Sequence, residues 1–375
     1  MKGIFIYNKR IDSNAVTGID KKVLWQVEAL SKEGCNCELV QLYDSFHSKI
    51  KKAIAIGVAR LPHGNAMPRI EWKNNYQGID FLYFRRPDAV SPAWLKLLKK
   101  IKEQNPGVKI IMEIPNYPYD DELGFKAINK PLLWKDRLFR EQLKHYVDRI
   151  AVQNDVNSIF GIQTIQFVNG IKFDDILIRE PVERDDETIN ICAVASLEPW
   201  QGYERVILGL KQYIENGGKR NIKIDIIGSG SEMEMYKHLI EENKLTEFVH
   251  MHGRLSGDSL RPYYNNADIA LDAFGRYKTG NMLSTSLKSR EYLAKGLPII
   301  TGCKTDILNK PFPYFMECNN DNSPVDFTEV VRFFDSIYRS GKTRVEIARD
   351  VRKYGRDICD ISVMVKPISE YLLAN

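Results

Sequence analysis

The segment from Gly280 to Gly302 (GNMLSTSLKSREYLAKGLPIITG) holds the residues whose types and spacing are best suited to chemistry. It predicts a loop, a helix over residues 287–295 that ends at Gly296, and then a buried strand. A helix N-terminus attracts anions, and Lys288 adds a positive charge to the first turn. This start of the helix is therefore suited to a diphosphate. The residues that could cap it are Ser284, Thr285 and Ser286.

Glu291 shares one side of this predicted helix with the apolar residues Leu287 and Ala294. A carboxylate on an apolar side needs a partner, because burying an unpaired charge is unfavourable. One alternative is a salt bridge to Arg290 or Lys295 at the surface. The other is a pair of sugar hydroxyls held at the start of the helix.

The composition indicates a globular protein. The chain has 375 residues, of which 43% are hydrophobic, and this is enough for two domains with a core each. No apolar run approaches membrane-spanning length, and the N-terminus lacks the long apolar region of a secretory signal. We therefore expect a cytoplasmic protein. The six cysteines show neither zinc-ligand spacing nor a disulfide framework.

Positive charge is concentrated in the first half of the chain. Residues 1–178 hold 27 Lys and Arg against 20 Asp and Glu, whereas residues 179–375 hold 27 against 29. This excess is compatible with an anionic acceptor or an anionic membrane surface. Residues 45–62 combine Lys with Ile and Phe, so they form either a basic amphipathic segment on a membrane or an ordinary surface helix or loop. Nucleic acid is not expected as a partner, because no DNA- or RNA-binding motif is present.

The order of the predicted elements indicates two doubly wound α/β domains, because a strand–loop–helix series starts at residue 2 and starts again after a charged linker near residues 177–188. The expected divisions are an N-terminal domain (1–178), a C-terminal domain (179–358) and a last helix (359–375). The strands expected are 2–7, 35–43, 79–85, 108–115, 148–155, 189–197, 221–227, 248–256, 269–274 and 297–301. The helices expected are 19–34, 92–104, 134–147, 158–162, 205–217, one after the Gly-Ser-Gly turn that continues to residue 243, 256–268, 287–295 and 362–374.

Five segments in the second half of the chain carry a resemblance to a known family. In order, they read VASLEPWQGY, IIGSG, HGRLS, YYNNADIAL and SLKSREYLAKGLPII. The chain resembles the two-domain glycosyltransferases of the GT-B type, in the retaining family 4 group that builds bacterial surface polysaccharides. The resemblance implies two Rossmann-like domains that face each other across a cleft, with the nucleotide sugar held mainly by the C-terminal domain. It also implies that the last helix returns to the N-terminal domain.

The match to this family is incomplete at the residues that bind the donor. The family commonly has two glutamates separated by seven residues; Glu291 matches the second, which holds the ribose, and the first position is Leu283. The family's Arg and Lys that grip the diphosphate fall at Ser196 and Gln201. A frequent histidine falls at Pro115.

The resemblance therefore implies a modified donor site. Because a diphosphate attracts clustered cations, we expect the missing pair to be replaced by other basic residues. The expected phosphate ligands are Arg276, Lys278 and Lys288. The other residues expected to bind the donor are Glu291, Ser284 and Ser286 on the helix segment, Gly253 and Arg254 near the base, and Gly18 and Asn116 in the N-terminal domain.

The function implied is transfer of a sugar from a nucleotide diphosphate, with UDP as the expected nucleotide, to a hydroxyl of a glycan or lipid-linked glycan, with retention. No cofactor or metal ion is expected. In this family the leaving phosphate is thought to help deprotonate the acceptor, so no side chain is assigned as a catalytic base. The alternatives are a UDP-sugar epimerase of the same fold, a catalytically inactive subunit, and a two-domain periplasmic binding protein.

Overall fold

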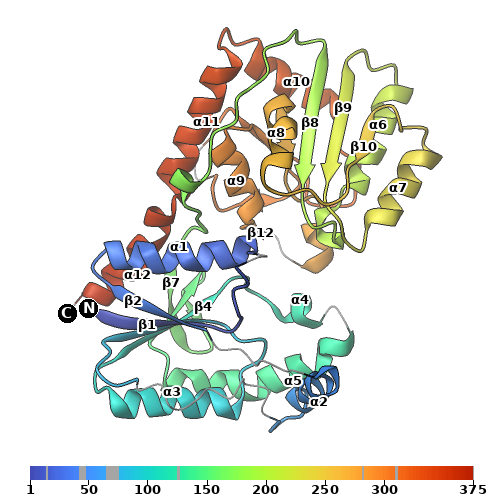
Figure 1. Ribbon diagram of the computed structural model, residues 1–375. Coiled ribbons are helices and arrows are strands. Elements are labelled where there is room, and N and C mark those ends of the chain that lie inside the picture. The colour runs from blue at the N-terminus through green and yellow to red at the C-terminus, as the bar shows by residue number, and fades with distance from the viewer. Residues whose placement is uncertain are drawn as a thin grey trace. The chain divides into compact units, whose positions relative to one another are not determined.

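The computed structural model describes residues 1–13, 16–41, 48–64, 76–124, 127–280, 283–308 and 311–374. The chain divides into two compact units, and the first combines both ends of the chain (Met1–Gly170 with Ile361–Asn375). The second unit is Ile171–Asp360. Each unit contains a largely parallel β-sheet with helices packed on it (Figure 1). The predicted fold class, two Rossmann-like α/β domains, is confirmed.

The first unit is built on a seven-stranded sheet with the order β2-β1-β3-β4-β5-β7-β6. Its strands are parallel except β6, which is antiparallel to β7. The strands are β1 (Lys2–Tyr7), β2 (Asn36–Gln41), β3 (Phe81–Arg85), β4 (Lys109–Ile114), β5 (Arg149–Val152), β6 (Ser158–Ile159) and β7 (Ile162–Gln166). The helices are α1 (Gly18–Lys32), α2 (Lys49–Ala59), α3 (Pro92–Gln104), α4 (Asp120–Gly124), η1 (Ala127–Asn129), α5 (Lys130–Phe139), η2 (Arg140–His145) and α12 (Ile361–Leu373).

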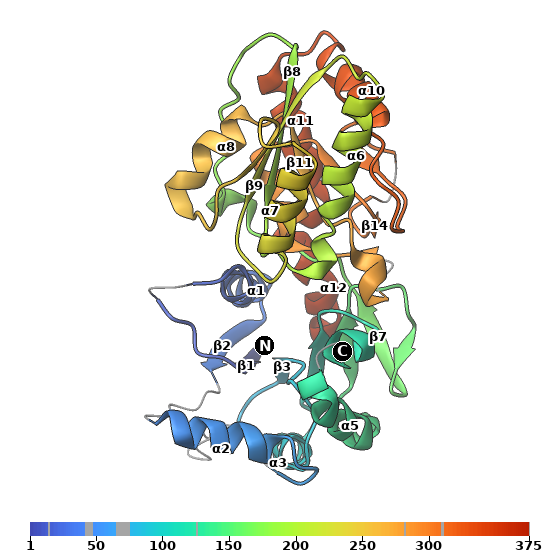
Figure 2. The same ribbon diagram turned by 90° about the vertical axis from the view of Figure 1, so that its right-hand side faces the viewer.

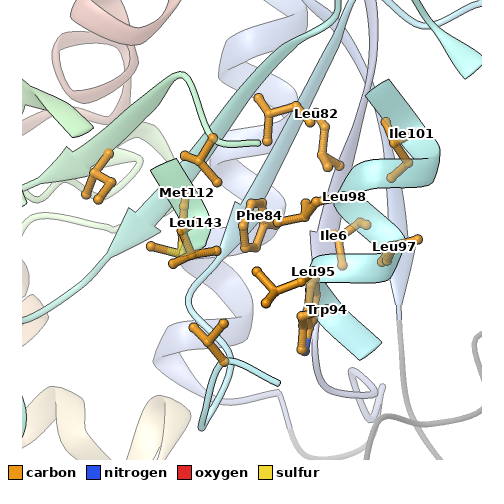
Figure 3. Packing of buried hydrophobic residues seen from close by; sticks show 14 of the residues in the cluster. Ile6, Leu82, Phe84, Trp94, Leu95, Leu97, Leu98, Ile101, Met112 and Leu143 are labelled. Atoms are coloured by element: carbon orange, nitrogen blue, oxygen red, sulfur yellow. The ribbon is translucent and has the colours of Figure 1, made fainter. Parts of the chain in front are cut away.

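The two faces of this sheet bury separate apolar cores, because successive side chains of a strand point to opposite faces. In β1, Ile4 and Ile6 join the core under α3, whereas Phe5 and Tyr7 join the core under α1 and α12. Figure 3 shows the first of these cores, with one side of α3 packed on side chains of β1, β3 and β4. The α3 residues in it are Trp94, Leu95, Leu97, Leu98 and Ile101.

Helix α12 is the last element of the chain and completes the second core of the first unit. Met364 and Ile368 are fully buried in that core. The Lys109 Nζ atom donates hydrogen bonds to the carbonyl oxygens of Tyr371 (3.2 Å) and Leu372 (3.0 Å). A positive charge is favourable there, because the last carbonyls of a helix carry partial negative charge.

One predicted helix of the first unit is wrong. Residues 158–162 form a hairpin instead, in which Ser158–Ile159 are β6, residues 160–161 are the tight turn, and Ile162 begins the antiparallel strand β7. Phe160 and Gly161 adopt φ angles of 52° and 76°. Two successive residues with positive φ favour a hairpin, since the twist of such a turn matches that of the strands. The apolar residues that indicated a helix pack into the sheet instead.

The segment 45–62, for which a membrane-binding helix is one alternative, contains α2 (Lys49–Ala59). Residues 45–47 of the segment, Phe46 among them, lie outside the described residues. Ile50 and Ile54 on α2 are 73% and 61% exposed. In the parts of the chain that the structure describes, no helix combines the length and the apolar character needed to cross a membrane.

The second unit is built on a six-stranded parallel sheet with the order β10-β9-β8-β11-β13-β15. Helices α6 and α7 pack side by side (Figures 1 and 2). The strands are β8 (Thr188–Val194), β9 (Asn221–Ile227), β10 (Val249–Met251), β11 (Ile269–Leu271), β13 (Ile299–Thr301) and β15 (Phe315–Glu317), with the separate pair β12 (Leu283–Ser284) and β14 (Lys304–Thr305). The helices are η3 (Phe173–Asp175), η4 (Pro199–Gln201), α6 (Glu204–Glu215), α7 (Met233–Glu242), η5 (Gly257–Leu260), α8 (Arg261–Asn266), η6 (Arg276–Thr279), α9 (Leu287–Lys295), α10 (Phe327–Tyr338) and α11 (Arg344–Cys359).

Candidate functional site

The loops that follow the strands of the second sheet meet at one edge, because all six strands are parallel. In open parallel sheets this carboxyl edge is where ligands bind. Two of the predicted site residues, Gly253 and Arg254, follow β10, and two others, Arg276 and Lys278, follow β11. These four residues, which the sequence predicts to bind the donor, therefore follow strands at the same edge of the sheet.

Helix α9 begins and ends as predicted. Ser286 is its N-cap, and the Ser286 hydroxyl accepts a hydrogen bond from the backbone N–H of Ser289 (3.3 Å). Gly296 ends the helix with a φ angle of 78°, a left-handed conformation that favours glycine. Of the three candidate caps, Ser286 has this role, whereas Ser284 lies in strand β12.

A buried carboxylate that the sequence analysis missed organises the start of α9. Asp272 directly follows β11 and is fully buried. Its two carboxylate oxygens accept hydrogen bonds from the hydroxyls of Ser284 (3.2 Å) and Ser286 (2.8 Å). The Lys288 Nζ atom lies 3.5 Å from Asp272 Oδ1. The only sequence signal for this role is the position of an acid directly after a short apolar strand, and that signal is common.

Lys288 is held inside this cluster. Its Nζ donates hydrogen bonds to the side-chain oxygen of Gln201 (2.7 Å) and to the hydroxyl of Tyr203 (3.0 Å). Gln201 is the position at which the resembling family has one of its two cations. Lys288 thus brings an ammonium group beside that position from an element far along the chain. Burial lowers the pKa of Lys288 from 10.5 to about 8, although the nearby Asp272 raises it.

Arg276 differs from the other predicted phosphate ligands. Its guanidinium Nε is buried and has no hydrogen-bond partner within the described ranges of the chain. Its positive charge lies close enough to Lys288 to contribute to the lowered pKa of that residue. Lys278, in contrast, forms an ion pair with Glu204 at 2.5 Å. A buried donor without an acceptor is unfavourable, so Arg276 is the cation best placed to receive an anionic ligand.

Glu291 is half-buried on α9, and Tyr264 of α8 is its hydrogen-bond partner. The Tyr264 hydroxyl donates to Glu291 Oε1 at 3.2 Å. Arg290, one of the surface partners considered for Glu291, is instead fully buried and pairs with Asp306. A carboxylate held by one tyrosine keeps acceptor capacity for further hydroxyl donors.

The loops after β9 and β10 hold each other through their backbones. The Gly228 N–H donates to the carbonyl oxygen of Gly253 (2.7 Å), and Gly253 has a φ angle of 66°. A Cβ atom on Gly228 would lie 1.8 Å from the carbonyl oxygen of Ala195, so glycine is required for close packing of the chain. Arg254 is exposed.

The remaining predicted residues, Gly18 and Asn116, belong to the first unit. Gly18 is the first residue of α1, after a capping box between Thr17 and Asp20. Asn116 is half-buried and follows β4. Gly18 therefore lies at the start of the helix that follows β1, and Asn116 in the loop that follows β4, so both are beyond the carboxyl ends of strands in the first sheet. No set of three or more His, Cys, Asp or Glu side chains in the described segments is arranged to hold a metal ion.

The comparison with protein families gives one match. Residues 174–302 match the family described as Glycosyl transferases group 1. This region runs from the start of the second unit through β13 and includes Asp272, Arg276, Lys288 and Glu291. A comparison with curated proteins gives no match.

Solved structures with the same fold align with almost the entire chain. A sucrose-phosphate synthase from Thermosynechococcus elongatus aligns with a TM-score of 0.65 and 12% identity, covering 99% of each chain. HepE from Anabaena in complex with UDP and glucose has a TM-score of 0.57, 12% identity and 99% coverage of each chain. The lipopolysaccharide outer core galactosyltransferase WaaB in its apo form has a TM-score of 0.58, 13% identity and 99% coverage of each chain.

At these identities the structural matches show the fold, and the family match adds the kind of enzyme. The chain has the GT-B fold of two Rossmann-like domains. The matched domain, which contains the cluster of Asp272, Arg276 and Lys288, supports a glycosyltransferase.

Proposed function

We propose that the protein is a retaining glycosyltransferase that uses a UDP-sugar as donor and a hydroxyl of a lipid-linked glycan as acceptor. The second unit would bind the donor, and the first unit the acceptor. The observation that carries the proposal is the buried Nε of Arg276, which has no partner in the described part of the chain and lies near the ammonium of Lys288. The complex of HepE with UDP and glucose supports UDP as the nucleotide.

In this reaction the site must stabilise a diphosphate as the leaving group. The bond between the anomeric carbon and the diphosphate oxygen breaks, and a bond to the acceptor oxygen forms on the same face of the sugar. The acceptor proton passes to an oxygen of the leaving phosphate. Arg276, Lys288 and the N-terminus of α9 would offset the charge that develops on the diphosphate. With these cations present, we propose that no metal ion is required.

The other predicted residues have supporting roles in this proposal. Glu291 would accept hydrogen bonds from the ribose hydroxyls, and its donor among the described residues, Tyr264, leaves acceptor capacity for them. Gly253 and Arg254 would approach the base. Lys278 would attract the phosphates more weakly than Arg276, because its charge is already paired with Glu204. Gly18 and Asn116 would complete the donor site from the first unit.

We also propose that the protein acts at the cytoplasmic face of a membrane in the synthesis of a surface polysaccharide. Helix α2 supports this, because Ile50 and Ile54 are exposed and Lys51 is exposed beside them. Apolar side chains next to a positive charge favour an anionic lipid surface. Wild-type protein should sediment with vesicles containing phosphatidylglycerol at low salt. A variant with Ile50→Glu and Ile54→Glu should remain in the supernatant, and equal sedimentation of the two proteins would contradict the proposal.

The enzyme proposal is tested by calorimetric titration with UDP and by hydrolysis assays with UDP-, GDP- and dTDP-sugars, each with and without EDTA. We expect UDP to bind and a UDP-sugar to be turned over equally in both conditions. Loss of turnover in EDTA would reject metal independence. Absence of both binding and turnover for all three nucleotides would reject the enzyme and favour a catalytically inactive subunit.

A further inference from the structure

The first unit contains a pocket that none of the predicted donor residues line. It has a volume of about 400 Å³ and lies between α4 and α5. Helix α4 follows the loop after β4, so the pocket opens near the carboxyl edge of the first sheet. The residues that line it are Asp120, Asp121, Gly124, Lys130, Leu133, Trp134 and Arg137.

One wall of the pocket is the side chain of Trp134, which is 55% exposed. Tryptophan is the largest apolar side chain, and in a protein without a ligand most of its ring is normally covered. Exposed aromatic rings beside a concave surface mark ligand sites, because the flat apolar ring contributes a large contact area at low entropic cost. The indole of Trp134 therefore supplies an apolar face to whatever enters the pocket.

The polar groups around this ring are of two kinds. Asp120 is already engaged, since one of its oxygens lies 2.8 Å from Arg137 Nη2 and the other 2.6 Å from Arg140 Nη1. These contacts hold Arg137 in place, and they lower the pKa of Asp120. Asp121 and Lys130 are exposed, and neither makes a hydrogen bond or ion pair to another described residue.

This combination of groups identifies the chemical class of the ligand. Asp120 is offset by its arginines, and Asp121 and Lys130 have opposite charges, so the lining does not select strongly for an anion or a cation. A purely apolar ligand would make no use of the exposed carboxylate and ammonium, and would be penalised wherever it separated them from water. A sugar ring fits both features, because it has an apolar face of C–H groups and a rim of hydroxyls that both donate and accept.

We propose that the pocket between α4 and α5 binds a neutral pyranose unit of a glycan, with one face of the sugar on Trp134 and hydroxyls bonded to Asp121 and Lys130. The inference rests on the proposed function in one respect: the glycan is the acceptor or its growing chain. The sugar that the pocket binds is a recognition unit and not the nucleotide-linked sugar.

Gly124 offers a way to close the pocket without removing any of its polar groups. A Cβ atom at this position would lie 3.2 Å from Leu133 Cδ2, on the opposite wall. A larger side chain, as in Gly124→Val, would occupy space between the two helices. It should therefore block the pocket and leave Trp134, Asp121 and Lys130 in place.

The test uses the full-length protein labelled with 5-fluorotryptophan. The chain has five tryptophans, so the ¹⁹F spectrum should contain five signals, and the one missing in Trp134→Phe identifies Trp134. The probes are maltotriose, cellotriose, mannotriose, galactotriose and chitotriose. We expect at least one of them to shift the Trp134 signal saturably, and Gly124→Val to abolish that shift. Asp121→Asn should weaken binding roughly fivefold, because the amide oxygen still accepts a hydrogen bond, and a bond to a neutral acceptor is weaker than one to a carboxylate by about 1 kcal/mol.

The matched control is Leu138→Ala on the same helix. Leu138 is 48% exposed but does not line the pocket, so this variant should bind the oligosaccharide like wild type. A Trp134 signal that no probe shifts, or a shift that persists in Gly124→Val, would overturn the pocket proposal. UDP binding measured on the same samples separates the two proposals. Binding of UDP without any glycan effect rejects only the pocket, and a glycan effect without UDP binding rejects only the UDP-dependent enzyme.

Discussion

Each of the two units has a buried cluster of charged side chains next to its sheet. The two clusters differ in how completely their charges are paired. In the first unit, Glu113 of β4 accepts hydrogen bonds from Lys22 (3.0 Å), Gln26 (2.9 Å) and Tyr83 (2.7 Å). Its pKa is lowered to about 2, because the attraction of Lys22 and Arg85 and these hydrogen bonds outweigh the effect of burial. This carboxylate has no need of an external partner.

The cluster in the second unit has positive charge in excess. Asp272 is paired with Lys288, and Lys278 with Glu204, but Arg276 has no ion pair among the described residues. The comparison indicates that a closed network stabilises a fold, whereas a cation without an ion pair, and with a buried N–H that lacks an acceptor, prepares a site for an anion. Variants in the two clusters should therefore change different measured quantities.

The largest effect is expected from Lys22→Met in the first cluster. Removing one partner of a buried ion pair leaves the other charge uncompensated, so the free energy of unfolding should fall by about 3–5 kcal/mol. Urea denaturation measures this loss. UDP affinity at low temperature should remain that of wild type. The matched control is Lys32→Met on the same helix, because Lys32 forms an exposed pair with Glu28 and should cost less than about 1 kcal/mol.

The same variant has a defined pH dependence. The folded state lowers the pKa of Glu113, so its contribution to stability is complete above the usual value of 4.5 and is lost as the pH falls towards 2. The stability difference between wild type and Lys22→Met should therefore narrow in acid. A difference that is constant from pH 7 to pH 3 would show that packing, and not the ion pair, stabilises this cluster.

The second-largest effect is expected from Arg276→Gln, which should weaken binding of the nucleotide donor. A hydrogen bond to a charged group is worth roughly 1.5–3 kcal/mol, so the dissociation constant of UDP should rise about 10- to 100-fold. Thermal stability should be unchanged or higher, since a buried donor without a partner is removed. Lys278→Gln should weaken UDP binding less, because Glu204 already offsets its charge. Equal effects of the two substitutions would erase the distinction between paired and unpaired cations.

A smaller effect on UDP affinity is expected at alkaline pH, where Lys288 loses its charge. With a pKa of about 8, Lys288 is protonated below that pH and becomes neutral above it. UDP affinity should therefore fall by roughly tenfold between pH 7 and pH 9.5. Calorimetry across this range is the measurement. Lys288→Arg should remove the dependence, because arginine remains charged, and a wild-type affinity that does not change with pH would exclude a role for this ammonium.

The smallest effect on UDP affinity is expected at Glu291, because the ribose that we propose it binds is neutral. Glu291→Ala should raise the dissociation constant of UDP about fivefold, as for the loss of one or two hydrogen bonds to hydroxyls. Wild type should prefer UDP to 2′-deoxy-UDP, and the variant should bind both nucleotides equally. A variant that keeps the preference would place the ribose elsewhere.

Much of the fold can be predicted from the sequence, because helix caps, helix stops and apolar spacing are local patterns. Helix α9 has a serine cap and a Gly-x-Pro stop, and α3 has regular apolar spacing; the predicted ranges of both helices match those observed. Residues 158–162 were predicted wrongly, since the run of apolar residues there does not distinguish a short helix from a hairpin. Helices α10 and α11, for which no prediction was made, lie in a region that carries no segment of the family resemblance.

The candidate site can be predicted from the sequence only in part, because its geometry depends on contacts between residues that are distant in sequence. Lys288 could be singled out from its place in the first turn of a helix. Its contacts with Gln201 and Tyr203 join residues more than 80 positions apart, and no local pattern indicates them. The same holds for Asp272, and for the difference between the paired Lys278 and the unpaired Arg276.

The position of α12 has a consequence for synthesis of the protein. The first unit takes one of its two cores partly from residues 361–373, so Met364 and Ile368 are missing from it until α12 has left the ribosome. The second unit, Ile171–Asp360, is complete before that point. During translation the first unit therefore buries this apolar surface only after the whole second unit has been made, and that face of its sheet is open to chaperones until α12 emerges.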